Sequence, residues 1–177
     1  MPISNGAGGH AWGLPPFSMG FWTTQDTATT GTPIPIVAAD TYYYLTNDGL
    51  GPASGGAFGL AGHADPWNTS TNAFDFSAMD VGYAFTLSID LNFITTGANT
   101  AVTLALELAS GSAIEFDLIP LSAVNYKTAG TYQETILSHF WTGRQDIVDS
   151  PTKLKVKADG TGTTVVVNAW VLQVVSQ

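Results

Sequence analysis

The chain has 177 residues, of which 45% are hydrophobic and 11% are charged, and its net charge at pH 7 is −9. This length suits one domain, or one domain with an arm, and the composition is that of a globular chain rather than a disordered one. Residues 1–126 hold ten acids and no Lys or Arg, which disfavours nucleic-acid binding; the apolar runs are too short for a membrane helix, and the lack of cysteine excludes disulfides.

The N-terminal stretch is rich in aromatic residues, glycine and proline, and no charged residue precedes Asp26. Gly and Pro disfavour a helix, and aromatic burial alone does not offset the entropy of ordering about 20 such residues. We therefore predict a docking arm at residues 1–24, ordered on a partner, followed by one domain at 25–177. The alternative is an arm packed on its own domain. The predicted docking residues are Trp12, Leu14, Phe17, Met19, Phe21 and Trp22.

Short strands are predicted at 33–37, 41–46 and 73–77, from their alternating apolar residues. Between the last two lies a long Gly-rich insertion, residues 47–72, whose aromatic residues indicate an ordered surface loop. His63 and Asp65, even with Asp48, match no metal-ligand spacing, so no metal site is assigned. A possible ligand-binding loop is predicted around Phe58, His63, Asp65 and Trp67.

The strongest periodic signal lies between Val81 and Ile94, where apolar and polar residues alternate with the period of a half-buried strand. Turn residues follow at 95–99, and alternation resumes at 102–108. The two segments are predicted to form a hairpin.

Further strands are predicted at 114–118, 131–141 and 153–157, and the last segment, 165–175, follows a Gly-rich turn. The three lysines of 153–157 are interpreted as a solvated edge strand. No segment shows a sustained helical period. Eight or nine strands separated by turns predict an antiparallel all-β sandwich or barrel.

The last predicted strand is apolar on both faces, which in an antiparallel sandwich requires a second covering surface. A neighbouring subunit is the simplest cover, and a loop of the same chain is the alternative. The predicted subunit-interface residues are Val165, Val167, Trp170, Val171 and Leu172.

Catalytic chemistry has little support in the sequence. Glu107 and Glu115 would face each other across a symmetric hairpin, as an acid/base pair or a calcium site, but a shifted register would leave them as two solvated side chains. No nucleophile elbow, metalloprotease helix, phosphate loop or dinucleotide motif is present. We expect no catalytic residues and no cofactor.

Residues 21–36, with the sequence FWTTQDTATTGTPIPI, resemble the start of the first strand in small jelly-roll proteins of tailed-phage virions. Phe74-Asp75-Phe76 before the long strand, and the segment from Leu154 to Trp170, are similar to the strand order of tumour necrosis factor-like sandwiches. The resemblance implies an antiparallel jelly roll that forms a trimer, with the last strand near the threefold axis. It also implies a place on a capsid as a cement protein, or in a fibre as a knob.

We therefore expect a homotrimeric decoration protein on the exterior of a phage capsid, made in the host cytoplasm, that binds the major capsid protein and stabilises contacts between capsomers. Nucleic acid and membranes are not expected partners. The alternative is a receptor- or glycan-binding knob of a head or tail fibre. An enzyme using Glu107 and Glu115 is a third and weaker hypothesis.

Overall fold

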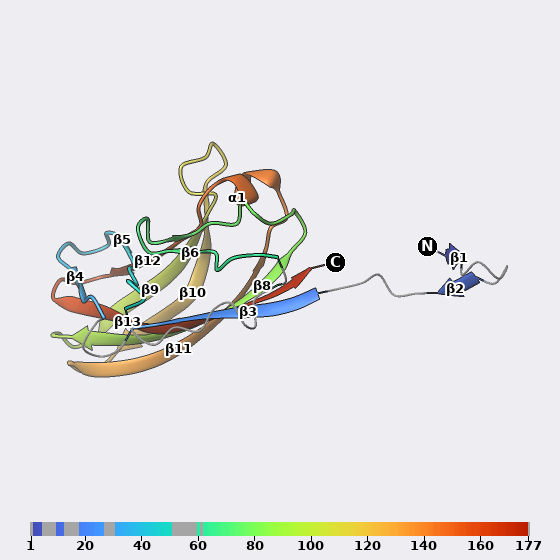
Figure 1. The fold of residues 1–177 in the computed structure, drawn as a ribbon. Helices are drawn as coiled ribbons and strands as arrows, with labels where there is room; N and C mark the ends of the chain where they lie inside the picture. Colours follow the sequence, from blue (N-terminus) through green and yellow to red (C-terminus); the bar gives the residue numbers. More distant parts are fainter. Residues whose placement is uncertain are drawn as a thin grey trace.

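A computed structural model gives the fold of the chain (Figure 1). The structure describes residues 2–4, 10–12, 18–26, 31–50, 60 and 62–176, and within these ranges the side chains outside 2–4, 10–12 and 118–120. Within those ranges, no helix has the length and apolar character needed to cross a membrane.

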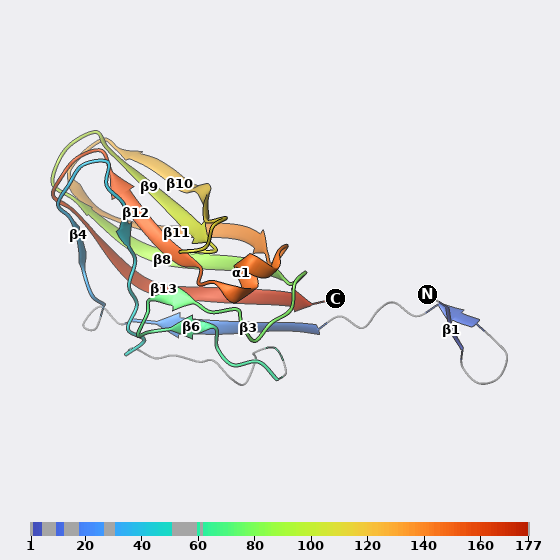
Figure 2. The same ribbon diagram turned by 90° about the horizontal axis from the view of Figure 1, so that it is seen from above.

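Two antiparallel sheets form a sandwich (Figure 2). The larger sheet has the order β11-β8-β13-β3, and β4 also pairs with β13; its strands are β3 (Ser18–Gln25), β4 (Ile34–Ile36), β8 (Ala84–Thr95), β11 (Gly130–Trp141) and β13 (Thr163–Ser176). The smaller sheet has the order β10-β9-β12-β5; its strands are β5 (Tyr43–Tyr44), β9 (Thr100–Leu108), β10 (Phe116–Tyr126) and β12 (Lys153–Ala158). The prediction of an antiparallel sandwich with eight or nine strands is confirmed.

Alternation along the strands builds the core between the sheets. On β8 the apolar side chains from Phe85 to Phe93 are buried while those between them are more exposed, as the period of two predicts. They pack against the inward residues of β9 and β12, including Leu104, Leu106 and Leu154. Ring contacts add to this packing, for instance between Phe76 and Phe85, whose centroids are 4.7 Å apart.

The predicted hairpin of residues 81–94 and 102–108 is wrong, because β8 and β9 lie in different sheets. The turn at 96–99 carries the chain from one layer to the other, so both strands face one core from opposite sides. The hairpin partner of β9 is β10, where Phe116 lies opposite Leu108. The sequence does not predict the one helix of the described residues, α1 (Gln145–Asp149), which is too short to show a helical period.

A β-bulge near Asn168 changes the alternation of β13. Its register against β8 shifts between Val167 and Ala169. Before the bulge the odd-numbered residues face the core, and after it the even-numbered ones do, so the buried set is Val165, Val167, Trp170, Leu172 and Val174. The apolar residues that the sequence pattern places on both faces of this strand therefore mostly point into the core, because the bulge reverses the alternation partway along the strand.

The boundary between arm and domain differs from the predicted one. Residues 18–25 form β3, which pairs with β13 from Ser18↔Ser176 to Gln25↔Ala169, so they belong to the sandwich. Before them, β1 (Pro2–Ser4) and β2 (His10–Trp12) form an antiparallel pair that lies apart from the sandwich in Figure 1. A second small pair joins β6 (Trp67–Asn68), inside the insertion, to β7 (Ala73–Phe74), which follows the insertion.

The predicted lysine edge is also corrected, because β12 lies between β9 and β5 and is not an edge strand. Lys155 is 9% exposed, and its ammonium lies 2.8 Å from Glu107 Oε2 and 2.6 Å from Asp117 Oδ1. Tyr44 also donates to Glu107 Oε1. The register places Asp117, not Glu115, opposite Glu107, so the predicted Glu107–Glu115 pair does not form.

The contacts of Lys155 decide how this cluster titrates. Burial acts to raise the pKa of Glu107, but hydrogen bonds from Lys155 and Ser110 outweigh it and lower that pKa. Burial likewise acts to lower the pKa of Lys155, and its bonds to Asp117 and Glu107 raise it. The cluster is therefore a charged structural link across β10, β9 and β12.

Replacing Lys155 with Met should lower the free energy of unfolding by about 3 kcal/mol or more at pH 7, because Glu107 would be left buried without its cation. Chemical denaturation measures the change. Lys157→Met is the matched control, since Lys157 is on the same strand and lies over the ring of Tyr42 without a described ion pair. The control should change the stability by less than about 1 kcal/mol.

The difference in stability between wild type and Lys155→Met should also depend on pH. A carboxyl with a lowered folded pKa contributes stability above its unfolded pKa and loses it as the pH falls through the folded value. The gap between wild type and Lys155→Met should therefore shrink below about pH 4.3, where glutamate ordinarily titrates. A gap that stays constant to pH 3 would contradict the role given to the Glu107 charge.

Candidate functional site

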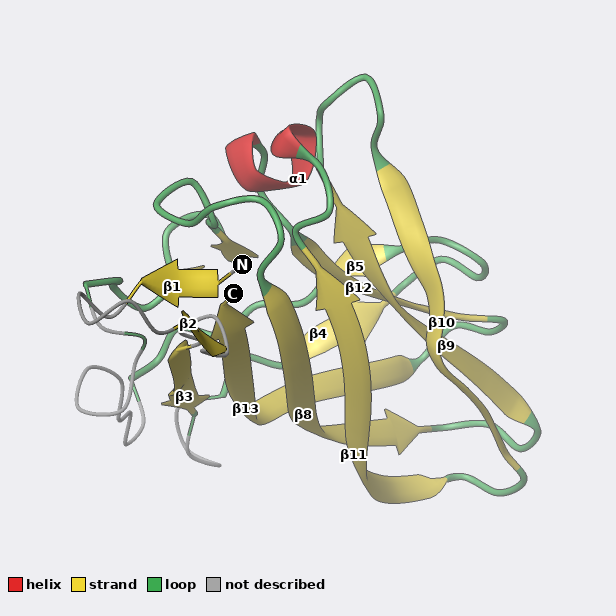
Figure 3. Cartoon of the chain, turned by 90° about the vertical axis from the view of Figure 1, so that its right-hand side faces the viewer, coloured by secondary structure: helices red, strands yellow, loops and turns green. Residues whose placement is uncertain are grey.

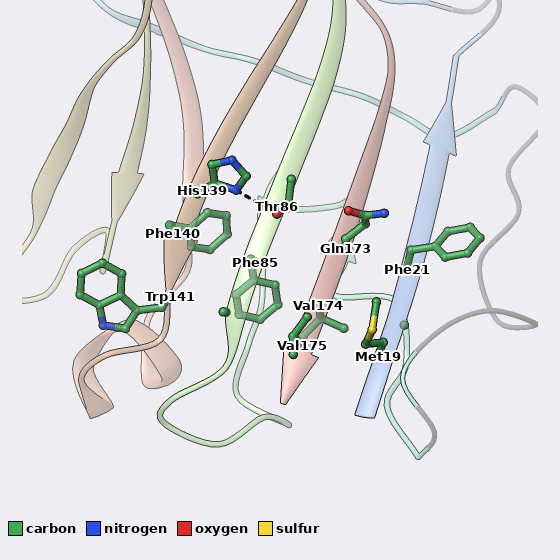
Figure 4. A pocket seen from close by; sticks show the side chains of 12 residues that line it. Met19, Phe21, Phe85, Thr86, His139, Phe140, Trp141, Gln173, Val174 and Val175 are labelled. Carbon is green, nitrogen blue, oxygen red and sulfur yellow. Dashed lines mark hydrogen bonds between the residues drawn. The ribbon is translucent and has the colours of Figure 1, made fainter. Parts of the chain in front are cut away.

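An apolar hollow lies on the outer face of the larger sheet, at the end where β3 begins and β13 ends (Figure 4). Its volume is about 650 Å³. Four neighbouring strands supply its walls, and Figure 3 shows them running side by side. The outward-facing side chains that line it include Met19, Phe21, Trp141 and Val175.

Most side chains that line this hollow point outward because the residues between the core positions of a strand lie on its opposite face. Met19 is 67% exposed, Trp141 is 66% exposed and Val175 is 37% exposed. Near the bulge, in the middle of the strands, the same face is polar: Gln133 donates to the carboxylate of Asp90 at 3.1 Å, and Asn92 donates to Asn168. The outer face therefore has an apolar end beside a polar middle region.

Trp141 is the largest exposed side chain of this apolar end. Its indole lies against the backbone of Gly143, where a Cβ atom would collide with Nε1 of the ring. A second hollow of about 240 Å³, lined by Leu108, Phe116 and Ile147 among others, lies on the α1 side of the same tryptophan. Trp141 thus stands between two apolar depressions on a rigid strand end.

Few polar groups interrupt the apolar end. His139 Nδ1 and Thr86 Oγ1 are 2.9 Å apart and form a hydrogen bond, which Figure 4 shows beside the hollow. Gln173 is exposed on β13. Across the described residues, no three acidic or histidine side chains come together at metal-ligand spacing. The arrangement is suited to burying apolar surface against a partner.

The predicted docking residues of the arm fall in different places. Leu14 and Phe17 lie outside the described residues, as does the side chain of Trp12. Met19 and Phe21 line the hollow. Trp22 is 1% exposed and packs in the core, because the alternation along β3 turns it inward. It is therefore a core residue and not a docking residue.

The predicted subunit-interface residues are corrected in the same way. Val165, Val167, Trp170 and Leu172 are buried in the core of their own sandwich, because the bulge keeps both halves of β13 facing inward. Val171 alone of the predicted set lies on the outer face.

Two residues of the predicted ligand loop, Asp65 and Trp67, lie in the wall of a hollow of about 360 Å³, and ligand binding there stays a prediction. Trp67 is buried, stacked edge-on against Trp170 at 4.1 Å between ring centroids, and its Nε1 donates to the carbonyl of Asn47. Asp65 caps the local turn by accepting from the Trp67 amide, and burial raises the pKa of Asp65. His63 contacts the ring of Tyr83 edge-on. Phe58 lies outside the described residues.

Sequence reasoning missed Trp141, His139 and Ala84 as parts of one site. A signal existed, because alternation within 131–141 places Leu137, His139 and Trp141 on one face. The pattern could not say which face of this strand meets the core, or that β3 and β13 would lie beside it.

No protein-family model matches the sequence, and a search of curated proteins finds no match either. Solved structures share the fold. The structure of Eiger TNF from S. frugiperda aligns with a TM-score of 0.50 and 11% identity, over 90% of this chain and 92% of that one. This likeness confirms a tumour necrosis factor-like jelly-roll fold.

Two viral structures also align at lower similarity. That of infectious bursal disease virus, Gx strain, has a TM-score of 0.42 and 13% identity, over 99% of this chain and 37% of that one. The vertex protein P5 of PRD1 has a TM-score of 0.34 and 12% identity, over 90% of this chain and 96% of that one. The fold assignment depends on the Eiger likeness alone.

Replacing Gly143 with Ala should displace the Trp141 indole, because the new methyl group occupies the space of the ring. The indole cross-peak of Trp141 in a ¹H–¹⁵N spectrum should shift, while the unfolding free energy changes by less than about 1 kcal/mol at this surface site. Trp141→Phe identifies the peak by its loss. An unchanged Trp141 peak in Gly143→Ala would contradict the described packing.

Proposed function

We propose that this chain is a structural protein of a virion, a phage-capsid decoration protein that acts as a homotrimer without catalysing a reaction. The observation that carries the proposal is the apolar end of the larger sheet, with Trp141 and Met19 two-thirds exposed. Monomeric proteins seldom expose contiguous apolar surface of this kind, and such patches mark interfaces.

The energetics favour association through this end. A tryptophan buries roughly 150 to 250 Å² when covered, so covering the exposed part of Trp141 contributes about 3 kcal/mol at ~25 cal/mol per Å². Met19, Phe21 and Val175 enlarge the same patch. A stable interface needs about 800 Å² per partner, and the rest of the sheet face can supply the remaining area.

The N-terminal residues support attachment to a larger particle. β3 begins at Ser18, beside the apolar end, so the chain enters the sandwich at the edge of this surface. Seventeen residues can span up to about 55 Å when extended, far enough to reach a neighbouring protein. Their aromatic and aliphatic residues, including Trp12, Leu14 and Phe17, would then dock on the major capsid protein.

Trp141→Glu and Met19→Glu should each convert a trimer into monomers, because either places a charge in the buried centre of the interface. Sedimentation velocity at micromolar concentration measures the change. Both side chains are exposed in the single chain, so the monomeric variants should keep their fold.

Val37→Glu is the matched control, because Val37 is 69% exposed and follows β4, away from the apolar end. It should remain trimeric. A wild-type chain that stays monomeric, or a Trp141→Glu variant that stays trimeric, would contradict self-association through this face. A monomer that binds glycans through Trp141 would favour the alternative of a fibre knob.

Deleting residues 2–17 should leave a folded trimer that no longer binds the capsid, because β3 is kept intact. Binding is measured by co-sedimentation of the truncated and full-length chains with purified particles of the parent phage. Retention of full binding by the truncated chain would show that the N-terminal residues are not the anchor.

A further inference from the structure

A nearly buried carboxylate at the end of β3 forms no ion pair among the described residues. Asp26 is 6% exposed, and its Oδ2 atom is buried with no hydrogen-bond partner. Its other oxygen, Oδ1, accepts from the amide of Gly49 at 2.8 Å. A buried carboxylate oxygen without a partner is costly unless a proton or a cation joins it.

A second carboxylate and a buried amide lie beside it. Asp48 precedes Gly49 in the chain, and its carboxyl group raises the pKa of Asp26. Asn47 is fully buried and directs its Oδ1 to the same Gly49 amide, at 2.9 Å, while its Nδ2 has no partner. The amide of Gly49 is therefore shared by Asp26 and Asn47, and Asp26 Oδ2 is the unpartnered acceptor that a cation could satisfy.

No basic side chain in the described part of the chain is paired with Asp26. No Lys or Arg occurs in residues 1–126, and the described ion pairs of Lys155 and Arg144 go to other acids. Burial, and then the neighbouring Asp48 carboxyl group, raise the pKa of Asp26 to about 6. Near pH 7.5, above that value, the Asp26 carboxyl is therefore mostly ionised.

We propose that Asp26 and Asp48 bind a calcium ion, which ties the end of β3 to the turn at residues 46–49. Oxygen ligands from an irregular turn suit Ca²⁺, whereas Mg²⁺ needs near-ideal octahedral geometry and releases water reluctantly. Two carboxylates make a weak site, with a dissociation constant of about 0.1 to 1 mM. The ion would stabilise the strand that borders the apolar end of the sheet.

The test is thermal unfolding of the full chain at pH 7.5 in EDTA, in 5 mM CaCl₂ and in 5 mM MgCl₂, at one ionic strength set with NaCl. Calcium should raise the melting temperature by about 3 to 6 °C, and magnesium should raise it by clearly less. Calorimetric titration with Ca²⁺ should show one site per chain.

Asp26→Asn keeps the shape and the acceptor for Gly49 but removes the charge, and it should abolish the calcium shift. Asp48→Asn, at a more exposed position, should do the same if the first variant folds poorly. Asp80→Asn is the matched control, since it removes one exposed negative charge elsewhere and should keep the full shift.

Three outcomes would overturn the proposal. An equal shift with Mg²⁺, or a full calcium shift in both Asp26→Asn and Asp48→Asn, would mean general screening of an acidic protein. No calcium shift at all, together with a melting temperature that falls between pH 5 and pH 7 in wild type but not in Asp26→Asn, would mean that a shared proton neutralises the pair instead.

Discussion

A single β-bulge in β13 is the constraint on which the rest of the sandwich depends. β13 is the central strand of the larger sheet, paired with β8 on one side and with β3 and β4 on the other. At the bulge, Asn168 accepts from the Asp26 amide at 2.7 Å and from the Asn92 side chain, so the irregular residue is held by both neighbours. Without it, one half of the strand would turn its valines outward.

The bulge also explains the two-part character of the outer face. The inward residues of β13 are apolar on both sides of Asn168, so they complete the core. The outward residues can therefore differ in polarity along the sheet. Near the bulge they are polar, with Asp90 bonded to Gln133, and at the far end they are apolar, around Trp141 and Met19. The proposed interface lies at that apolar end, where β3 begins.

Charge is distributed just as unevenly as hydrophobicity. The smaller sheet holds three lysines, and the buried one is satisfied by two carboxylates on adjacent strands. Among the described residues, Asp26 is a buried acid that forms no ion pair. A carboxylate beside Lys155 is therefore part of a stable structural link, whereas the Asp26 carboxylate at the end of β3 has no described ion pair.

The sequence determined the fold class and most strands by itself, because a half-buried strand must alternate, and 81–94 and 102–108 do so. It could not assign strands to sheets: the turn at 96–99 has the composition of a hairpin turn but carries the chain between layers. The sequence also could not show which residues of β13 face the core, because the extra residue of the bulge exchanges the inward and outward positions of all residues after it. Tertiary structure alone brought Trp141, Met19 and Val175 together from three strands, because side-by-side position in a sheet depends on long-range pairing that no local pattern encodes.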